Sequence, residues 1–305
     1  MPRTEDRLRG ALLGLALGDA VGAPFEGWPR VGGAEVDAWL DDGARLRWTD
    51  DTHMALTLAQ VLDADDGTLD EERLGDAFAA AFAEQPWRGY GAGPPQVFAL
   101  ARRGLTYREA AASLFGGSGS FGNGAAMRVA PVALVARSDL ERAAELAAAQ
   151  ARVTHTHPEG VEGAVFVATA AAVLATSDAP VDSMPQLLRT TTERMSADPL
   201  RRALTEVLAA APDVERLTRV ARRVGTGVAA RESVPAAVAA LLSGHDVVST
   251  LRAAVVLGGD TDTIAAMAGT LAGAVHGASD IPRRLLDRLE AAEQLEALAS
   301  ALLER

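Results

Sequence analysis

The chain has 305 residues, of which 49% are hydrophobic and 4% aromatic, and its formal net charge is −12. The absence of cysteine excludes disulfide bonds and thiolate metal sites, and the acidic balance argues against nucleic-acid binding. The N-terminus is charged and lacks the apolar core of a signal peptide, and the most apolar stretch, 164–176, is shorter than the ~20 residues that span a bilayer. We therefore expect a cytoplasmic protein with no membrane partner.

Alanine is abundant along the whole chain, and period-two strand patterns are hard to find. Alanine has the highest helix propensity, and small side chains let helix axes approach closely. No repeat and no long Pro/Ser-rich linker divides the chain, so the sequence predicts one all-α domain over residues 1–305. The expected helices, in chain order, lie near 4–20, 50–63, 70–84, 93–103, 107–114, 124–136, 139–151, 158–176, 184–193, 198–210, 213–223, 234–242, 246–256, 262–276 and 282–304.

The run Thr49-Asp50-Asp51-Thr52 stands at the start of the second expected helix. A single Asp or Thr at such a position is usually an N-cap, because its side-chain oxygen satisfies a free backbone N–H. One oxygen is enough for that task, so the cluster holds more carboxylates and hydroxyls than capping needs.

A glycine-rich stretch, 116–124, precedes the expected helix 124–136 and contains the only Asn of the chain, Asn123. It includes a literal G-x-G-x-x-G, which signals a dinucleotide site only between a strand and a helix, and no strand pattern precedes it. We expect instead that its backbone N–H groups point inward at the start of the helix, an arrangement that suits a diphosphate. The alternative is a plain turn.

Two histidines, His155 and His157, stand in a His-x-His pattern before the expected helix 158–176. They could ligate a transition metal, or one could contact a ligand while the other faces solvent. The remaining histidines, His53, His245 and His276, are expected to be structural.

A second acidic cluster, Asp260-Thr261-Asp262-Thr263, stands at the start of the expected helix 262–276. If the two clusters meet, four carboxylates would be concentrated in one place, and only cations would neutralise them at low cost. The ligand set is all oxygen, which favours Mg²⁺ or Mn²⁺ over Zn²⁺. The two clusters therefore predict a split metal site.

Six sequence blocks, taken together and in this order, resemble the ADP-ribosylglycohydrolase family, which includes dinitrogenase-reductase-activating glycohydrolase and the ADP-ribosyl-acceptor hydrolases. The resemblance runs from about residue 8 to residue 277. The blocks are Gly14-x-x-x-Gly18-Asp19-Ala20-x-Gly22-x-Pro24-x-Glu26, Trp48-Thr49-Asp50-Asp51-Thr52, Arg88-Gly89-Tyr90-Gly91, Gly119-Ser120-Phe121-Gly122-Asn123-Gly124, Thr154-His155 and Gly258-Gly259-Asp260-Thr261-Asp262-Thr263.

The resemblance implies an orthogonal bundle of helices around a cleft that holds two Mg²⁺ or Mn²⁺ ions. Two divalent ions would balance the four aspartates, and such a pair can orient a water. The implied catalytic residues are Asp50 or Asp51, as the base that polarises water, and Glu26, as a metal ligand or general acid. The alternative for Glu26 is a solvated loop carboxylate. The implied metal ligands are Thr49, Asp50, Asp51, Asp260, Asp262 and Thr263.

The resemblance also implies how ADP-ribose binds. The loop of Gly119, Ser120, Phe121, Gly122, Asn123 and Gly124 would hold the diphosphate, with Asn123 on a ribose and His155 in contact with the ligand. Tyr90 or Phe121 would stack on the adenine. The carboxyl of Asp19 is expected to be structural and to hold the Glu26 loop through backbone hydrogen bonds.

The implied activity is hydrolysis of the C1″ glycosidic bond of ADP-ribose on protein side chains, by a monomer that binds ADP-ribose and ADP-ribosylated proteins. The blocks around Asp260 and Arg88 favour O-linked substrates, serine or poly-ADP-ribose, over N-linked ADP-ribosyl-arginine. Two alternatives of other classes stay open: a metal-dependent phosphoric-ester hydrolase and a non-catalytic ADP-ribose-binding protein.

Overall fold

The computed structural model describes residues 3–304, and within them all regular elements are helices. The prediction of an all-α fold is therefore confirmed. The α-helices are α1 (Arg3–Gly22), α2 (Gly33–Asp41), α3 (Asp50–Ala64), α4 (Glu71–Glu84), α5 (Gly93–Ala101), α6 (Tyr107–Gly117), α7 (Ala130–Ala136), α8 (Leu140–Arg152), α9 (Pro158–Thr176), α10 (Met184–Thr192), α11 (Asp198–Ala210), α12 (Val214–Val224), α13 (Ala230–Ser243), α14 (Val247–Leu257), α15 (Thr261–His276), α16 (Arg283–Leu286) and α17 (Ala292–Leu303). Short 3-10 turns lie at Ala23–Phe25, Val181–Ser183 and Ala278–Asp280.

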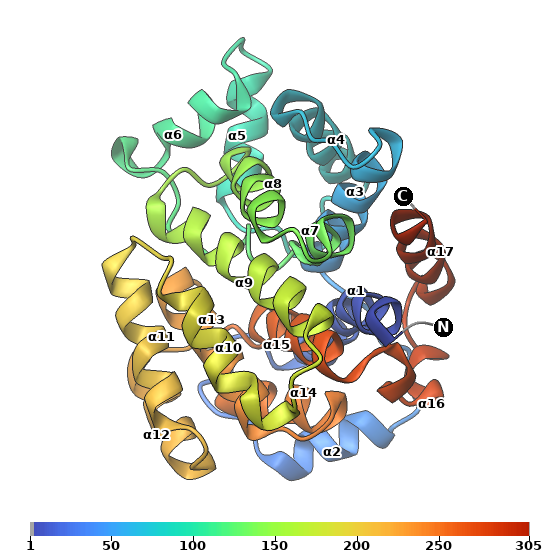
Figure 1. Cartoon of the computed structure of the whole chain (residues 1–305). Coiled ribbons are helices and arrows are strands. Elements are labelled where there is room, and N and C mark those ends of the chain that lie inside the picture. The colour runs from blue at the N-terminus through green and yellow to red at the C-terminus, as the bar shows by residue number, and fades with distance from the viewer. Residues whose placement is uncertain (1–2, 305) are drawn as a thin grey trace.

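Helices α1 and α15 form an antiparallel pair at the centre of the molecule (Figure 1). Their backbones touch because small residues recur every four positions on the facing side of each helix. A Cβ added at Gly14 would lie 2.2 Å from the carbonyl oxygen of Gly269. The facing pairs are Gly10 with Gly273, Gly14 with Gly269, Gly18 with Ala265 and Gly22 with Thr261. This packing brings the last turn of α1 to the first turn of α15.

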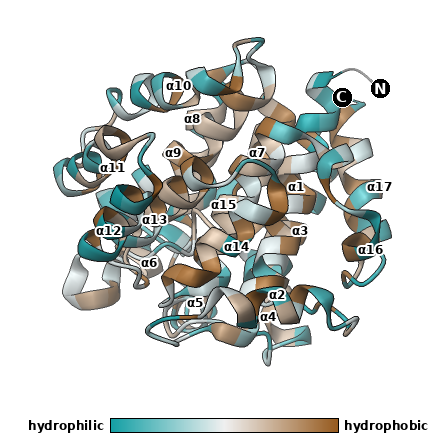
Figure 2. Cartoon of the chain, turned by 90° about the horizontal axis from the view of Figure 1, so that it is seen from below, coloured by the Kyte–Doolittle hydropathy of each residue, from teal (hydrophilic) through white to brown (hydrophobic). Residues whose placement is uncertain are grey.

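The other helices surround this pair, with α3, α7 and α17 on one side and α9, α13 and α14 on another (Figure 1). Outer helices such as α12 and α17 show both hydrophilic and hydrophobic stretches (Figure 2). Helices α1 and α9 are long and apolar enough to cross a membrane by length and composition alone. In the folded protein, 83% of the most apolar 18-residue stretch of the first helix is buried, and 72% of that of the second. Packing in the core therefore accounts for their apolar character.

Three segments differ from the sequence-based expectation. Helix α2 lies in a stretch expected to be a loop, and it buries Val36 and Leu40, one turn apart. The expected helix 124–136 begins only at Ala130, because Pro131 occupies its first turn and the residues before it form turns. The expected helix 282–304 is two helices, separated near Ala291, which has a positive φ of 56°.

Candidate metal centre and ligand loop

The first acidic cluster forms the N-terminus of α3, as expected. Thr49 is the N-cap residue, and its side chain accepts a hydrogen bond from the N–H of Asp51. Asp19, in α1, holds this helix start in place. Its carboxylate accepts a hydrogen bond from the N–H of Thr49 at 2.9 Å, and two from Thr52, from its N–H at 2.9 Å and from its hydroxyl at 2.6 Å. Asp19 is thus structural in these contacts, but the expectation that it holds the Glu26 loop is wrong. It holds the start of α3, because one buried carboxylate can satisfy several free N–H groups of a helix end.

The second acidic cluster begins α15, with Asp260 as the N-cap residue. A strap formed by the chain after α1 runs alongside it. The N–H of Gly27 donates to the carbonyl of Gly259 at 2.8 Å, and the N–H of Gly259 donates to the carbonyl of Trp28 at 2.7 Å. These two bonds fix the loop that carries Glu26 next to α15.

The carboxylates of Glu26, Asp260 and Asp262 converge, with oxygen atoms that all lie within 4.8 Å of one another. The hydroxyl of Thr263 lies 3.5 Å from Asp51 Oδ1, so the two helix starts meet at this point. The structure therefore brings both clusters and Glu26 to one place.

Every carboxyl in this group has a raised pKa. Burial is the largest cause. For Asp50, Asp51 and Asp262 the charges of neighbouring carboxylates add to it, whereas for Asp260 hydrogen bonds, first of all that from Asn123, act against it. Burial together with Asp260 and Asp19 raises the pKa of Asp262 to about 9, and burial together with Asp19 raises that of Asp50 to about 7. Partial burial and the charge of Asp260 also raise the pKa of Glu26. Ionised together without a cation, these groups would destabilise the fold.

The donor set fits a hard divalent cation. Asp51 Oδ2 is buried and has no hydrogen-bond partner among the described residues, although an unpaired buried carboxylate oxygen is costly. All the converging groups offer oxygen ligands, which Mg²⁺ and Mn²⁺ prefer. Of the residues that the resemblance implies as ligands, Asp260 and Asp262 converge with Glu26, the implied ligand or general acid, which lies on the exposed side of the group.

The glycine loop, residues 119–124, is joined to the acidic group by Asn123. The Asn123 side-chain amide donates to Asp260 Oδ2 at 2.6 Å and to the hydroxyl of Ser233 at 3.1 Å. In these contacts its amide nitrogen is turned to the acidic group, so only its oxygen is left for a ribose. Asn123 thus connects the loop to the first turn of α15.

The loop does not lead directly into α7, so the expectation that it sits on the N-terminus of that helix is wrong. It packs instead against the first turn of α9, where a Cβ added at Gly160 would lie 2.7 Å from the carbonyl oxygen of Ser120. Among the described residues, the N–H groups of Ser120, Phe121 and Gly124 find no acceptor. They are donors available to an anion.

The two histidines of the His-x-His pattern have different environments. His155 is buried, its Nδ1 lies 2.8 Å from the hydroxyl of Thr154, and its Nε2 faces Gly122 and Gly124. His157 is the N-cap residue of α9, and its Nδ1 accepts from the N–H of Glu159. Neither lies in the carboxylate group, so the structure gives no metal site to this pattern within the described residues.

The aromatic residues proposed for adenine lie in different places. The hydroxyl of Tyr90 is 2.9 Å from His53 Nδ1, the ring packs against Phe82, and the charge of Asp50 acts on the hydroxyl. Phe121 is on the loop and 38% exposed, and its ring centroid is 6.3 Å from that of Phe115, which is 57% exposed. Sequence reasoning missed Phe115. No pattern marks it, because its position depends on a positive φ of 52° where α6 breaks after Ser113.

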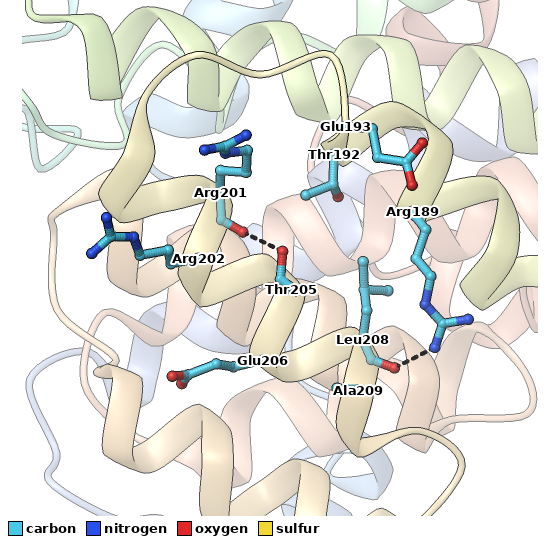
Figure 3. Close-up of a pocket in the computed structure, with 9 residues that line it drawn as sticks. All are labelled: Arg189, Thr192, Glu193, Arg201, Arg202, Thr205, Glu206, Leu208 and Ala209. Atoms are coloured by element: carbon cyan, nitrogen blue, oxygen red, sulfur yellow. Dashed lines mark hydrogen bonds between the residues drawn. The ribbon is translucent and has the colours of Figure 1, made fainter.

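A cavity of about 560 Å³ between α10 and α11 contains none of the expected site residues (Figure 3). Two of its polar side chains are tied to the helices themselves, since Arg189 donates to the carbonyl of Leu208 and Thr205 to that of Arg201. The convergence of acidic and loop residues, and not this cavity, marks the candidate site.

Comparison with known proteins finds similar chains over the whole length of the sequence. The family model described as ADP-ribosylglycohydrolase matches residues 1–305. ADP-ribosylhydrolase ARH3 of Bos taurus is 33% identical over 98% of this chain and 93% of its own length, and that of Homo sapiens is 32% identical over the same shares. A solved structure titled ADP-ribosylglycohydrolase-related protein complex superposes with a TM-score of 0.78 at 30% identity, covering 100% of this chain and 99% of the other.

Proposed function

Because the chain belongs to the ADP-ribosylglycohydrolase family, we propose that it hydrolyses the C1″ glycosidic bond between ADP-ribose and a protein side chain. The observation that carries the proposal is the hydrogen bond from Asn123 to Asp260, which places a loop with free N–H donors next to a group of converging carboxylates. A diphosphate held by the loop would bring the distal ribose to the carboxylates.

Cleavage of this bond passes through an oxocarbenium-like state and needs a positioned water, an acid for the leaving group and a hold on the sugar hydroxyls. Asp50 or Asp51, at the start of α3, would accept the proton of the water. Glu26 lies on the exposed side of the group, and its raised pKa suits a carboxyl that donates a proton or binds a cation. The attacked bond would lie between Glu26 and the start of α3.

We propose two divalent cations, Mg²⁺ or Mn²⁺, as cofactors, held by the oxygen ligands described above. When bound, they would supply positive charge that lowers the pKa of water and polarises the ribose hydroxyls. The raised pKa values and the unpaired oxygen of Asp51 support this part of the proposal.

Phe115 and Phe121 would offer the adenine an aromatic surface to stack on, because they form an exposed aromatic pair beside the loop. Stacking on such rings is tolerant of geometry and contributes ~1–3 kcal/mol per base. Tyr90, whose hydroxyl is engaged by His53, would line the acidic side of the cleft instead.

We propose O-linked substrates, serine-linked or poly-ADP-ribose, with N-linked ADP-ribosyl-arginine as the alternative. The support is the resemblance of the Asp260 and Arg88 blocks to the branch of the family that acts on O-linked ADP-ribose. Partners would be ADP-ribosylated proteins, bound by a monomeric cytoplasmic enzyme.

Paired peptides that carry ADP-ribose on serine or on arginine test this proposal. We expect Mg²⁺-dependent release of intact ADP-ribose from the serine peptide, identified by mass spectrometry and abolished by EDTA. Release of AMP would select a phosphoric-ester hydrolase, and release only from the arginine peptide would reverse the proposed linkage. Tight ADP-ribose binding without release from either peptide would indicate a non-catalytic binding protein.

A further inference from the structure

The first turns after the glycine loop contain a fully buried arginine, Arg128, which no step of the proposed reaction uses. All five of its N–H groups have acceptors. Nε donates to Gln150 Oε1 at 2.8 Å, and Nη1 donates to the carbonyl of Gly124 at 3.0 Å and to Met54 Sδ at 3.7 Å. Nη2 donates to the carbonyl of Gln150 at 3.0 Å and to the hydroxyl of Thr154 at 2.9 Å.

The contact with Thr154 decides where the threonine proton goes. A guanidinium only donates, so the Thr154 oxygen must accept from Arg128. The single hydroxyl proton is then free for the other partner of that oxygen, His155 Nδ1, at 2.8 Å. If Nδ1–H donated instead, the oxygen would accept twice, and the buried hydroxyl proton would have no acceptor among the described residues. Nδ1 therefore accepts, and the proton of a neutral imidazole resides on Nε2.

The Nε2 atom faces the glycine loop. A Cβ added at Gly124 would lie 3.2 Å from it and one at Gly122 3.5 Å, and no described residue accepts a hydrogen bond from it. An Nε2–H at this place would donate into the space in front of the loop. The opposite tautomer would direct a lone pair at the same space and would repel an anion.

We propose that Arg128 is a positioning residue that acts through Thr154 to fix His155 as the neutral Nε2–H tautomer, so that the imidazole donates to an anionic oxygen of the ligand held by the glycine loop. The inference rests on the proposed function for the identity of the ligand, a diphosphate. Burial and the charge of Arg128 also lower the pKa of His155, to about 3, and keep the ring neutral.

The tautomer is measured directly by ¹⁵N NMR of the full chain labelled at histidine, without any ligand. The chain has five histidines, and His155→Gln assigns the signals of interest. We expect His155 at pH 7 to show a protonated Nε2 and an unprotonated Nδ1. A protonated Nδ1, or an imidazolium, would overturn the inference whatever the enzyme cleaves.

The Thr154 hydroxyl connects Arg128 to His155, and we call this connection the relay. Thr154→Val removes the hydroxyl with little change in volume. We expect the His155 signals to shift towards a mixture of tautomers, and the affinity for ADP-ribose, measured by calorimetry, to fall by about tenfold, the size expected for one hydrogen bond to a charged group. Thr154→Ser keeps the hydroxyl and should retain both the tautomer and the affinity. Thr192→Val is the matched control, because among the described residues the buried hydroxyl of Thr192 bonds to one group, the carbonyl of Leu188 in α10.

Arg128→Lys tests the origin of the relay, because a lysine supplies three donors and no planar fork. It should give a tautomer mixture like that of Thr154→Val. If this variant does not fold, Thr154→Val alone decides. Unchanged tautomer and affinity in Thr154→Val would overturn the inference while leaving the proposed function intact. Failure of the wild type to bind ADP-ribose would instead contradict the proposed function. The tautomer of His155 would still decide the inference about Arg128.

Discussion

Buried carboxyl groups at the meeting point of α3 and α15 keep their protons to higher pH in the folded protein than in the unfolded chain, because burial and mutual repulsion raise their pKa values. Between ~pH 4, where free Asp titrates, and these raised values, the folded state binds more protons than the unfolded state. The free energy of unfolding of the metal-free protein must therefore fall as the pH rises through the folded pKa values, about 7 for Asp50 and about 9 for Asp262.

We predict that EDTA-treated protein loses roughly 1–3 kcal/mol of stability between pH 6.5 and pH 8.5, and that Mg²⁺ or Mn²⁺ reverses the loss, since a ligand that binds only the folded state stabilises it. Thermal unfolding at both pH values, with and without the ion, measures this. The matched control is Asp139→Asn, because the Asp139 side chain caps α8, a role that Asn also fills. A metal-free melting temperature that is equal or higher at pH 8.5 would contradict the assignment.

Phe115 and Phe121 form an exposed aromatic pair at the glycine loop. Phe115→Ala or Phe121→Ala should weaken binding of ADP-ribose by about 5- to 100-fold, the effect of losing one base–aromatic stack, and should leave binding of ribose 5-phosphate unchanged. Trp87→Ala is the control, because Trp87 is also exposed, at 72%, but lies in the loop before α5. Calorimetry with both ligands checks this. Equal losses of affinity for the two ligands would contradict stacking of the adenine on Phe115 and Phe121.

At the scale of elements, the position of the site depends on how closely α1 and α15 approach. Glycines let the two backbones touch, and this contact sets Asp19, near the end of α1, and Asp262, at the start of α15, on the same side of the molecule. Asp19 then fixes the start of α3 through three donors. The end of α1 and the starts of α3 and α15 are distant in sequence, and the packing of α1 against α15 brings them together.

Gly14→Ala should destabilise the protein by about 1–3 kcal/mol or more, because the new methyl group would overlap the backbone of Gly269 and force the helices apart. Urea unfolding measures the loss. Gly91→Ala is the matched control, since nothing lies within 4 Å of a Cβ at that position, and a change within about 0.5 kcal/mol is expected. If both variants unfold at the wild-type urea concentration, the close approach does not hold the pair.

At the scale of the whole molecule, helical periodicity and alanine content were enough to predict an all-α chain, and the acidic clusters were correctly placed at two helix starts. The convergence of Glu26 with Asp260 and Asp262 could be expected only from the resemblance, because it depends on the strap between Gly27 and Gly259. Sequence reasoning could not predict the start of α7, the partners of Asp19 or the position of Phe115 beside Phe121. Each depends on a local break or a long-range contact that no periodic pattern records.

Arg128 and Asn123 show a further limit of sequence reasoning. A charged residue in an apolar segment signals burial with partners, but the sequence does not say that Gln150 and Thr154 are those partners. Likewise, the single Asn of the chain marks the glycine loop, whereas its hydrogen bond to Asp260 appears only when α15 is brought beside that loop.

In the proposed metal site, residues far apart in the sequence, from the starts of α3 and α15, hold the same cations. Calorimetric titration of Mn²⁺ into the wild type, Asp51→Asn and Asp262→Asn tests it most directly. We predict two ions per wild-type chain and loss of tight binding in both variants, with the helical circular dichroism unchanged. Full Mn²⁺ affinity and stoichiometry in either variant would contradict a site shared between the starts of α3 and α15.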